Sequence, residues 1–298
     1  MKMNSNVVRR VASILIVVFA SVFFIYAVVV DSKTESIKNF PMVIDFAGEK
    51  TPTNIVDVYE RLDREIITNT NYHTNSILVM KRANKVFPII EPILAKYGIP
   101  DDFKYLAVIE SSLVNAVSPA GARGVWQFMP ATAKEKGLEV TDEVDERYHL
   151  VKSTEAACVY LLDAKEKFGN WTLAAASYNG GMAGVQRQLD KQGVSSYYDV
   201  LLTEETARYV FRILALKEIM THPEAYGFKL PKETLYNNIP TRIVEVDSSI
   251  TDFALFAKEQ GINYKVLKLH NPWLRDTELV NKAKKKYLIE IPTSGYGE

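Results

Sequence analysis

The chain contains few of the side chains that form disulfides or bind metal ions, namely cysteine and histidine. Its one cysteine, Cys158, lies in an apolar helical pattern and cannot form an internal disulfide, so we interpret it as a small buried residue. Its 4 histidines are scattered and show no ligand spacing. The sequence therefore predicts a fold without internal disulfides, without a metal site and without a cofactor.

An excess of charge of either sign is also missing. The 298 residues include 36 basic and 36 acidic side chains, so the formal net charge is zero. Without a basic excess, the protein has no overall field that draws it to nucleic acid. We expect no nucleic-acid partner, whereas a neutral polymer is compatible with this balance.

One long apolar run stands apart from the rest of the chain. Residues 11–30 contain no charged side chain, and basic residues precede them. A run of about 20 residues can cross a bilayer as a helix, and the basic residues place the N-terminus in the cytoplasm. We expect a cytoplasmic stub and a retained anchor over residues 1–30. A cleaved secretory signal is the alternative, although Val28–Asp31 is a poor cleavage site.

Changes of pattern divide the remaining chain into three regions. Residues 31–53 are mixed and contain prolines and a glycine, which predicts a linker. Residues 54–232 contain several helical patterns, separated by a glycine-punctuated loop and by turns, so the fold class is mainly α. Residues 238–293 predict a strand, two short helices and a second strand.

Glu110 is the candidate catalytic residue of the helical region. It lies in the helix predicted after Pro100, three residues after Ala107 and four before Val114, on the apolar stripe. Burial disfavours an ionised carboxylate and raises its pKa, as general-acid chemistry at neutral pH requires. The structural alternative is a buried glutamate paired with a cation such as Arg123.

The loop after this helix offers groups that suit a sugar polymer. Ser111 and Ser118 supply hydroxyls close to the acid, and Gln127 supplies an amide beside Trp126 and Met129. Apolar platforms mixed with neutral hydrogen-bonding groups are expected of a glycan site. These side chains are therefore the candidate substrate contacts in the loop.

The run ESSLVNAVSPAGARGVWQFMP, which starts at Glu110, resembles the Glu-Ser and Gly-Leu-Met-Gln motifs of family 1 lytic transglycosylases, the soluble-transglycosylase type. It is most similar to the membrane-bound lytic murein transglycosylase D branch, which often has Trp-Gln in place of Met-Gln. Two further motifs follow in family order, WTLAAASYNGG and EETARYVFRILALKEI. The chain departs from the family at Gly124–Gln127 and at Asn115–Ala116, which affects the shape of the subsites and the role of Ser118.

The resemblance implies a goose-type, lysozyme-like helical domain in which Glu110 is both acid and base. By the same resemblance, Tyr178 would hydrogen-bond Glu110 or the nearby sugar, and Asn179 would contact the glycan. Tyr209 would form the wall of the cleft. The Asp145–Arg147 triplet resembles the Asp-Glu-Arg turn of the family, to which we assign a scaffold role.

The C-terminal pattern resembles a degenerate LysM peptidoglycan-binding module. The Asn271–Pro272 turn and the terminal Ile291–Pro292 match the module. Val246–Ile250 replaces its usual Gly-Asp-Thr-Leu, and the return to the last strand is longer and more charged. We expect the βααβ fold to be kept, while binding of sugar by this module stays open.

These features together predict a peptidoglycan lytic transglycosylase of the bacterial inner membrane, single-pass, with its catalytic domain in the periplasm. Cleavage of the signal would instead release it into the periplasm. Glu110 alone would cut the β-1,4 bond between N-acetylmuramic acid (MurNAc) and N-acetylglucosamine (GlcNAc), leaving 1,6-anhydroMurNAc ends. The partners expected are peptidoglycan glycan strands and the membrane; no protein partner follows from the sequence. One alternative is a lysozyme-type muramidase with a second acid such as Asp142 or Asp145. The other is a catalytically silent peptidoglycan-binding protein.

Overall fold

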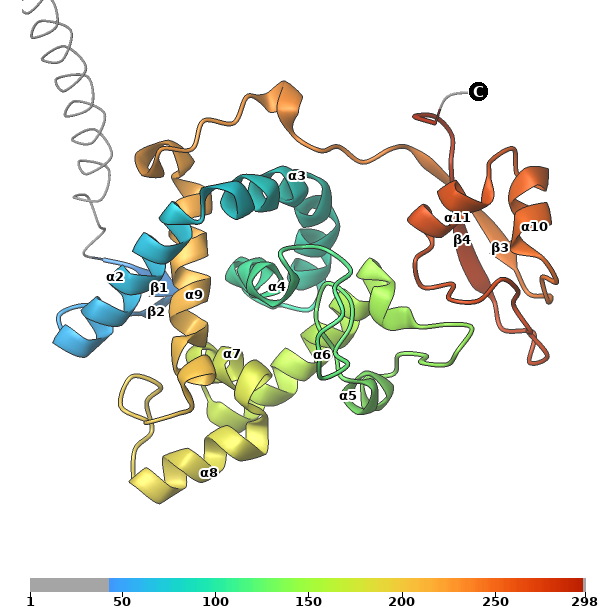
Figure 1. Cartoon of the computed structure of the whole chain (residues 1–298). Coiled ribbons are helices and arrows are strands. Elements are labelled where there is room, and N and C mark those ends of the chain that lie inside the picture. The colour runs from blue at the N-terminus through green and yellow to red at the C-terminus, as the bar shows by residue number, and fades with distance from the viewer. Residues whose placement is uncertain (1–42, 297–298) are drawn as a thin grey trace, which may run out of the picture.

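A computed structural model describes residues 43–296, about half of which form α-helices (Figure 1). This confirms the predicted mainly α class. The helices of the N-terminal body are, in chain order, α2 (Val56–Asn71), α3 (His73–Lys96), α4 (Lys104–Ser111), α5 (Pro130–Glu135), α6 (Leu150–Phe168), α7 (Trp171–Gly180), α8 (Met182–Gln192) and α9 (Glu204–Thr221).

Local sequence accounts for several of the helix ends. Gly169 adopts a φ of 74° and ends α6, and the side chain of Asn170 then accepts a hydrogen bond from the Leu173 amide to cap α7. Pro88 and Pro92 both lie inside α3 without ending it.

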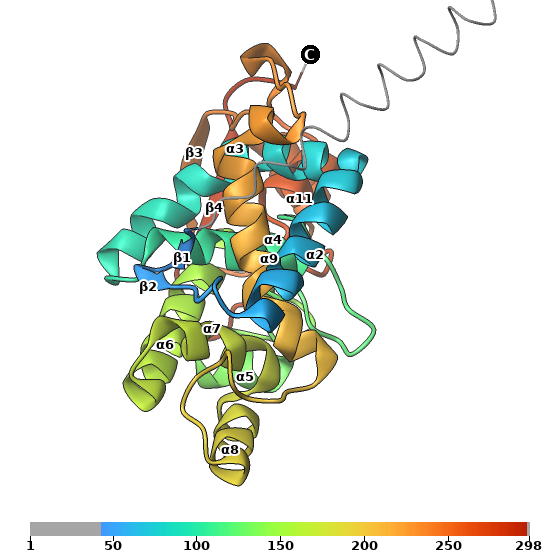
Figure 2. The same ribbon diagram turned by 90° about the vertical axis from the view of Figure 1, so that its left-hand side faces the viewer.

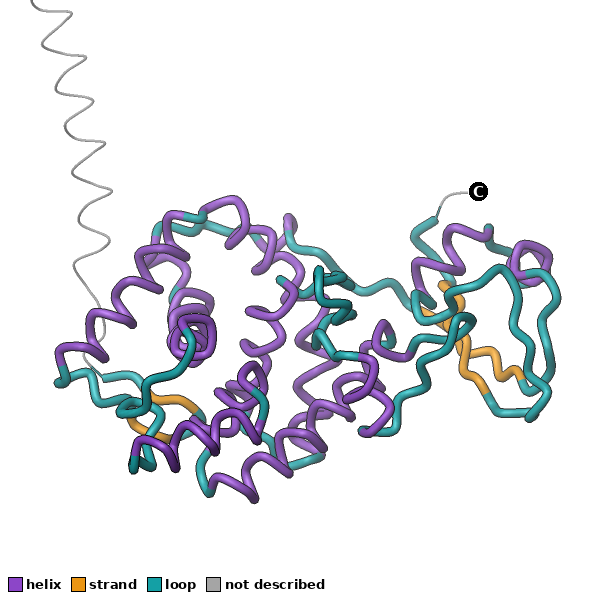
Figure 3. The backbone as a smooth tube through the Cα atoms, turned by 60° about the horizontal axis from the view of Figure 1, so that its bottom comes forward, coloured by secondary structure: helices purple, strands orange, loops and turns teal. Residues whose placement is uncertain are grey.

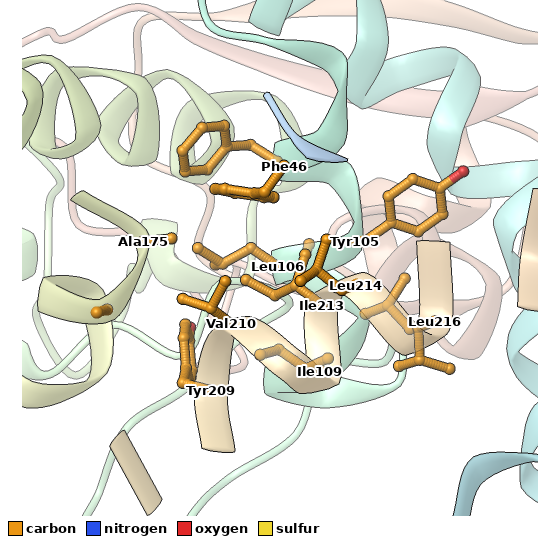
Figure 4. Close-up of a cluster of buried hydrophobic side chains, with 14 of the residues drawn as sticks. Phe46, Tyr105, Leu106, Ile109, Ala175, Tyr209, Val210, Ile213, Leu214 and Leu216 are labelled. Carbon is orange, nitrogen blue, oxygen red and sulfur yellow. The ribbon is translucent and has the colours of Figure 1, made fainter. Parts of the chain in front are cut away.

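The short helix α4 lies at the centre of the body, surrounded by the longer helices (Figure 1). Figure 3 shows that helices make up most of this body, with one pair of strands at its edge and the other pair in the C-terminal domain. Its residues from Tyr105 to Ile109 are all buried, and a helix that is apolar on every side belongs in a core. Leu106 and Ile109 of α4 lie beside Val210 and Ile213 of α9 (Figure 4). The helix that carries Glu110 is thus fixed mainly by α9.

A small hairpin precedes the helices. It consists of β1 (Asp45–Phe46) and β2 (Glu49–Lys50), which pair antiparallel. Figure 2 shows the molecule from the side on which this hairpin lies. Phe46 is fully buried, with its ring 5.1 Å from that of Phe103. The linker predicted over residues 31–53 is therefore wrong for residues 43–53, which pack on the helical body.

Polar contacts attach this hairpin to two more elements. The Glu49 carboxylate accepts hydrogen bonds from the amides of Trp171 and Thr172 at the start of α7, at 2.6 and 2.9 Å. Asp102, just before α4, accepts from the Ala47 amide and from Lys217 of α9. A carboxylate at a helix N-terminus is favourable, because it satisfies amides that lack a partner within the helix.

The C-terminal domain has the predicted βααβ order. Strands β3 (Thr241–Val246) and β4 (Tyr287–Pro292) pair antiparallel, with α10 (Phe253–Glu259) and α11 (Tyr264–His270) between them in the chain. Alternate residues of the strands face the helices, so that Val246, Ile289 and Ile291 share a core with Phe253 and Leu267.

A turn of the body, residues 139–149, is built into that second core. Val144 and Tyr148 are buried in it together with Trp273 and Leu274. The Asp145 amide donates to the Trp273 carbonyl at 2.9 Å, and the bridge between Val144 and Leu274 continues this pairing. The two domains therefore share apolar and backbone contacts.

Within the described range, residues 43–296, no helix combines the length and the apolar character needed to cross a membrane. The anchor predicted over residues 1–30 lies outside that range.

We expect Phe46→Ala to lower the free energy of unfolding by about 3 kcal/mol, because it leaves a cavity between the hairpin and Phe103. Urea unfolding of a soluble fragment that begins at residue 43 measures this change. Val43→Ala is the matched control, since Val43 is 76% exposed. Equal unfolding midpoints for the two variants would contradict the packing of the hairpin on the body.

Candidate active site

Glu110 is half-buried in the last turn of α4. The helix ends one residue later, at Ser111, because Ser112 and Leu113 adopt positive φ angles of 53° and 60°. The predicted apolar stripe is therefore wrong at Val114, which lies beyond this turn and is 38% exposed. The position of Glu110 depends on the packing of α4 rather than on a stripe that continues past it.

Three polar residues of α9 surround this carboxylate. The Tyr209 hydroxyl donates a hydrogen bond to Glu110 Oε1. Arg212 donates to the Ile109 carbonyl at 3.2 Å, which holds its guanidinium near the acid. Glu205, Tyr209 and Arg212 are four and three residues apart, so they share one face of α9.

Burial raises the pKa of Glu110 to about 7. The hydrogen bond from Tyr209 and the positive charge of Arg212 act against this rise, whereas the negative charge of Glu205 adds to it. The carboxyl group is therefore divided between its acid and base forms near neutral pH. A single group in this state can donate a proton in one step and accept one in the next.

Tyr178 is not the tyrosine that hydrogen-bonds Glu110. Its hydroxyl donates to the Trp126 carbonyl at 2.8 Å, and burial, together with the charge of Glu110, holds its pKa well above the usual range. Tyr178 therefore lies near the acid and supports the loop beside it. The bond that the resemblance assigned to Tyr178 is made by Tyr209, which was expected only as a wall of the cleft.

Ser111, Ser118 and Gln127, which were predicted as substrate contacts, form hydrogen bonds that stabilise the conformation of the loop. Ser111 is buried and donates to the Val125 carbonyl at 2.8 Å, while the Ser118 hydroxyl accepts from the Ala122 amide at 3.0 Å. The amide nitrogen of Gln127 donates to two carbonyls of the same loop. Met129, directly before α5, is 42% exposed.

The conformation of this loop requires a glycine at position 124. Its φ is 85°, and a Cβ atom on it would lie 1.9 Å from the carbonyl oxygen of Arg147. Arg147 in turn forms a bidentate pair with Asp145, both side chains being buried, and donates to the carbonyls of Gly121 and Phe128. These contacts support the scaffold role predicted for the Asp145–Arg147 triplet.

Asp145 is therefore unsuited to be a second catalytic carboxylate, because Arg147 occupies both of its oxygens. Asp142 is exposed on the same turn. The acid that influences Glu110 is Glu205, which sequence reasoning missed together with Arg212. Their spacing from Tyr209 along one helix face was the available signal.

Asn179 links the ends of two helices at this site. Its amide nitrogen donates to Glu205 at 3.1 Å, and its oxygen accepts from the Thr206 hydroxyl at 2.7 Å. Glu205 also lies where two surface hollows of about 620 and 550 Å³ meet. The first is lined by residues of α2 and α9, including Arg208 and Arg212, and the second by residues around α8.

Of the eight predicted site residues, the structure gathers Glu110, Tyr178 and Tyr209 directly, with Asn179 joined to them through Glu205. Among residues 43–296, no group of three or more His, Cys, Asp or Glu side chains is arranged to hold a metal ion.

Comparison with known families agrees with this architecture. Residues 88–200 match the transglycosylase SLT domain, and residues 242–295 match the soluble lytic transglycosylase C-terminal LysM-like domain. The chain therefore contains both domains, which confirms the resemblance and the lysozyme-like and LysM-like folds that it implied.

Two curated relatives match a longer part of the chain than either domain does. The chain is 31% identical over 190 residues to the membrane-bound lytic murein transglycosylase D of Escherichia coli K12, and equally to that of Escherichia coli O6:H1. The match covers 62% of this chain and 41% of each relative, so the chain spans about two fifths of the length of these relatives.

Tyr209 and Tyr178 should differ in their effect on the pKa of Glu110. Tyr209→Phe removes the hydrogen bond to the ionised carboxylate, so we expect the pKa of Glu110 to rise by about 1 pH unit. Tyr178→Phe is the matched control and should leave that pKa nearly unchanged, because its hydroxyl binds the Trp126 carbonyl. Titration of carbon-13-labelled glutamate side chains by NMR reports the pKa. A larger rise in Tyr178→Phe would reverse the assignment.

Glu110 should also cost stability at alkaline pH. Its pKa is about 7 in the folded state against an ordinary 4.5, so the folded state binds the proton more tightly, and stability falls as pH rises from 4.5 through 7. Glu110→Gln should therefore be more stable than the parent at pH 8, by up to about 3 kcal/mol, and similar to it at pH 4. Urea unfolding at the two pH values gives the difference. A variant less stable than the parent at pH 8 would show that the ionised carboxylate is well solvated or paired.

Proposed function

We propose that this protein is a peptidoglycan lytic transglycosylase that cuts the β-1,4 bond between MurNAc and GlcNAc, with Glu110 as its only acid and base. The observation that carries the proposal is the half-buried carboxyl group of Glu110, whose pKa is raised to about 7 and whose orientation is fixed by Tyr209. The matched SLT domain and the named activity of the relatives support the same reaction.

The reaction would use both protonation states of Glu110. In its acid form, Glu110 gives a proton to the glycosidic oxygen, the bond from that oxygen to C1 of MurNAc breaks, and GlcNAc leaves with a free hydroxyl. The resulting carboxylate then takes the proton of the muramyl C6 hydroxyl while the C6 oxygen bonds to C1. The product is a 1,6-anhydroMurNAc end, and Glu110 is protonated again for the next turnover.

The residues around Glu110 would assist these two steps. The hydrogen bond from Tyr209 is strongest to the ionised carboxylate, so it favours the state that follows proton donation. Arg212 stabilises the same state through its charge. Asn179 and Glu205, at the meeting of the two hollows, are the polar groups best placed to contact the sugar chain.

Hydrolysis by a muramidase mechanism is the second candidate, and one observation favours it. Glu205 is a second carboxylate near enough to raise the pKa of Glu110. A hydrolase needs such a group to activate a water molecule or to bind the sugar covalently. Glu205 is exposed and already hydrogen-bonded by Asn179, so we favour a role in binding.

The cellular setting follows from the sequence outside the described residues. We propose that residues 11–30 anchor the protein in the bacterial inner membrane and that the helical body, residues 54–232, acts in the periplasm. Release into the periplasm after signal cleavage is the alternative. In either case the glycan strands of peptidoglycan would be the substrate.

The product of the reaction separates the two mechanisms. A soluble fragment incubated with purified sacculi should release fragments that end in 1,6-anhydroMurNAc, because the C6 hydroxyl takes the place of water. Such ends are about 18 Da lighter than hydrolysed ends and resist borohydride reduction, by the loss of one water in the chemistry described above. Mass spectrometry before and after reduction reads both properties. Reducible, hydrated ends as the main product would identify a hydrolase.

Two variants control this experiment. Glu110→Gln fills the same space but cannot transfer the proton, so it should lower the rate on the order of a thousandfold. Glu205→Gln should keep the anhydro product, whereas hydrolysis through Glu205 would require its carboxylate. Intact sacculi after treatment with folded parent protein would support the silent binding protein instead.

A further inference from the structure

A cavity of about 660 Å³ lies between the helical body and the C-terminal domain. On the side of the body it is lined by α3 and by the loop that follows Glu110, through Asn115 and Val125. On the opposite side it is lined by the end of α11, the turn after it and β4. It is separate from the hollows that meet at Glu205, which lie along α9.

Glu290 of β4 brings an unpaired carboxylate to this cavity. The buried side chain of Asn271 bonds both the amide and the carbonyl of Glu290, at 2.8 and 2.7 Å, so the backbone there is fixed. The Glu290 side chain is half-buried, and burial raises its pKa. Among residues 43–296, no hydrogen bond or ion pair engages its carboxylate. A partly desolvated carboxylate without a protein partner is available to a cationic group of a ligand, which would offset the cost of its burial.

Lys85 brings a positive charge to the same cavity from α3. Burial and the nearby charge of Lys85 lower the pKa of His270, which also lines the cavity and lies 3.0 Å from the Tyr296 hydroxyl. In the described part of the chain, the Lys85 ammonium has no ion pair, and it does not pair with Glu290. One domain thus contributes a cation and the other an anion, with the cavity between them.

The remaining wall is apolar and aromatic. The buried ring of Trp273 lies 5.7 Å from that of His149 and 5.8 Å from that of Tyr287. Burial lowers the pKa of His149 to about 4, so His149 is neutral at pH 7 and adds no charge. The cavity therefore offers one cation, one anion and a flat apolar surface.

We propose that this interdomain cavity is a second, non-catalytic substrate site that binds the stem peptide of peptidoglycan, with Glu290 holding an ammonium group and Lys85 a carboxylate of the peptide. The inference rests on the proposed function, since the peptide is the part of peptidoglycan that carries both charges. A glycan strand without peptides carries no ammonium group, so it would leave the half-buried Glu290 carboxylate without a partner.

The site joins peptide recognition to the loop beside the catalytic acid. Asn115 and Val125 line the cavity, and the Val125 carbonyl accepts a hydrogen bond from Ser111, the residue after Glu110. A strand held by its peptide in the cavity would therefore be bound against the same loop that supports the acid. This arrangement favours glycan strands that still carry peptides over strands from which the peptides have been removed.

Calorimetry on the full chain in detergent, carrying Glu110→Gln to prevent turnover, tests the proposal. The probe is a free stem tetrapeptide that contains diaminopimelate, which has both an amine and carboxylates. We expect saturable binding, and we expect Glu290→Gln and Lys85→Met each to weaken it at least tenfold. Glu245→Gln on β3 and Lys96→Met on α3 are matched controls outside the cavity, and they should leave the dissociation constant unchanged.

Several outcomes would overturn it. Absence of peptide binding, or binding unaffected by both cavity variants, would remove the peptide site. Weaker binding of peptide-free glycan strands in the same two variants would identify a glycan site instead. Thermal unfolding of each variant checks that the domains stay folded. Because the assay measures binding of peptide without cleavage, its failure is distinct from failure of the transglycosylase proposal, which the anhydro product decides.

Discussion

The packing of α4 against α9 determines the position and the pKa of the Glu110 carboxyl group. It removes Glu110 from most of the water that would otherwise stabilise its charge, and it brings the Tyr209 hydroxyl onto the carboxylate. Desolvation and this hydrogen bond act in opposite directions on the pKa, and desolvation is the larger effect. A small change in the distance between the two helices would alter both at once.

Two other parts of the body restrict changes in the distance between α4 and α9. The β1–β2 hairpin contacts the segment before α4, the start of α7 and Lys217 of α9, so it connects three elements of the site. On the other side, Arg147 and Gly124 hold the loop after α4 through close backbone contacts. These contacts keep the Glu110 carboxyl group and the loop beside it in a fixed arrangement.

Periodicity and motif order were enough to predict the mainly α class, the βααβ order of the C-terminal domain and the burial of Glu110. Which tyrosine reaches the acid could not be predicted, because Tyr178 and Tyr209 lie on different helices and the answer depends on how these helices pack. The early end of α4 was also hidden, since Ser112 and Leu113 give no signal of a positive φ. The hairpin was missed because its strands are only two residues long.

The turn at residues 139–149 has a consequence for the order of folding. Val144 and Tyr148 are buried only when residues from α10, α11 and β4 cover them, and those residues come far later in the chain. Contacts of such long sequence separation form slowly, and a chain made from its N-terminus exposes Val144 until the last strand exists. The turn of the helical body therefore acquires its apolar covering only after β4 has been synthesised.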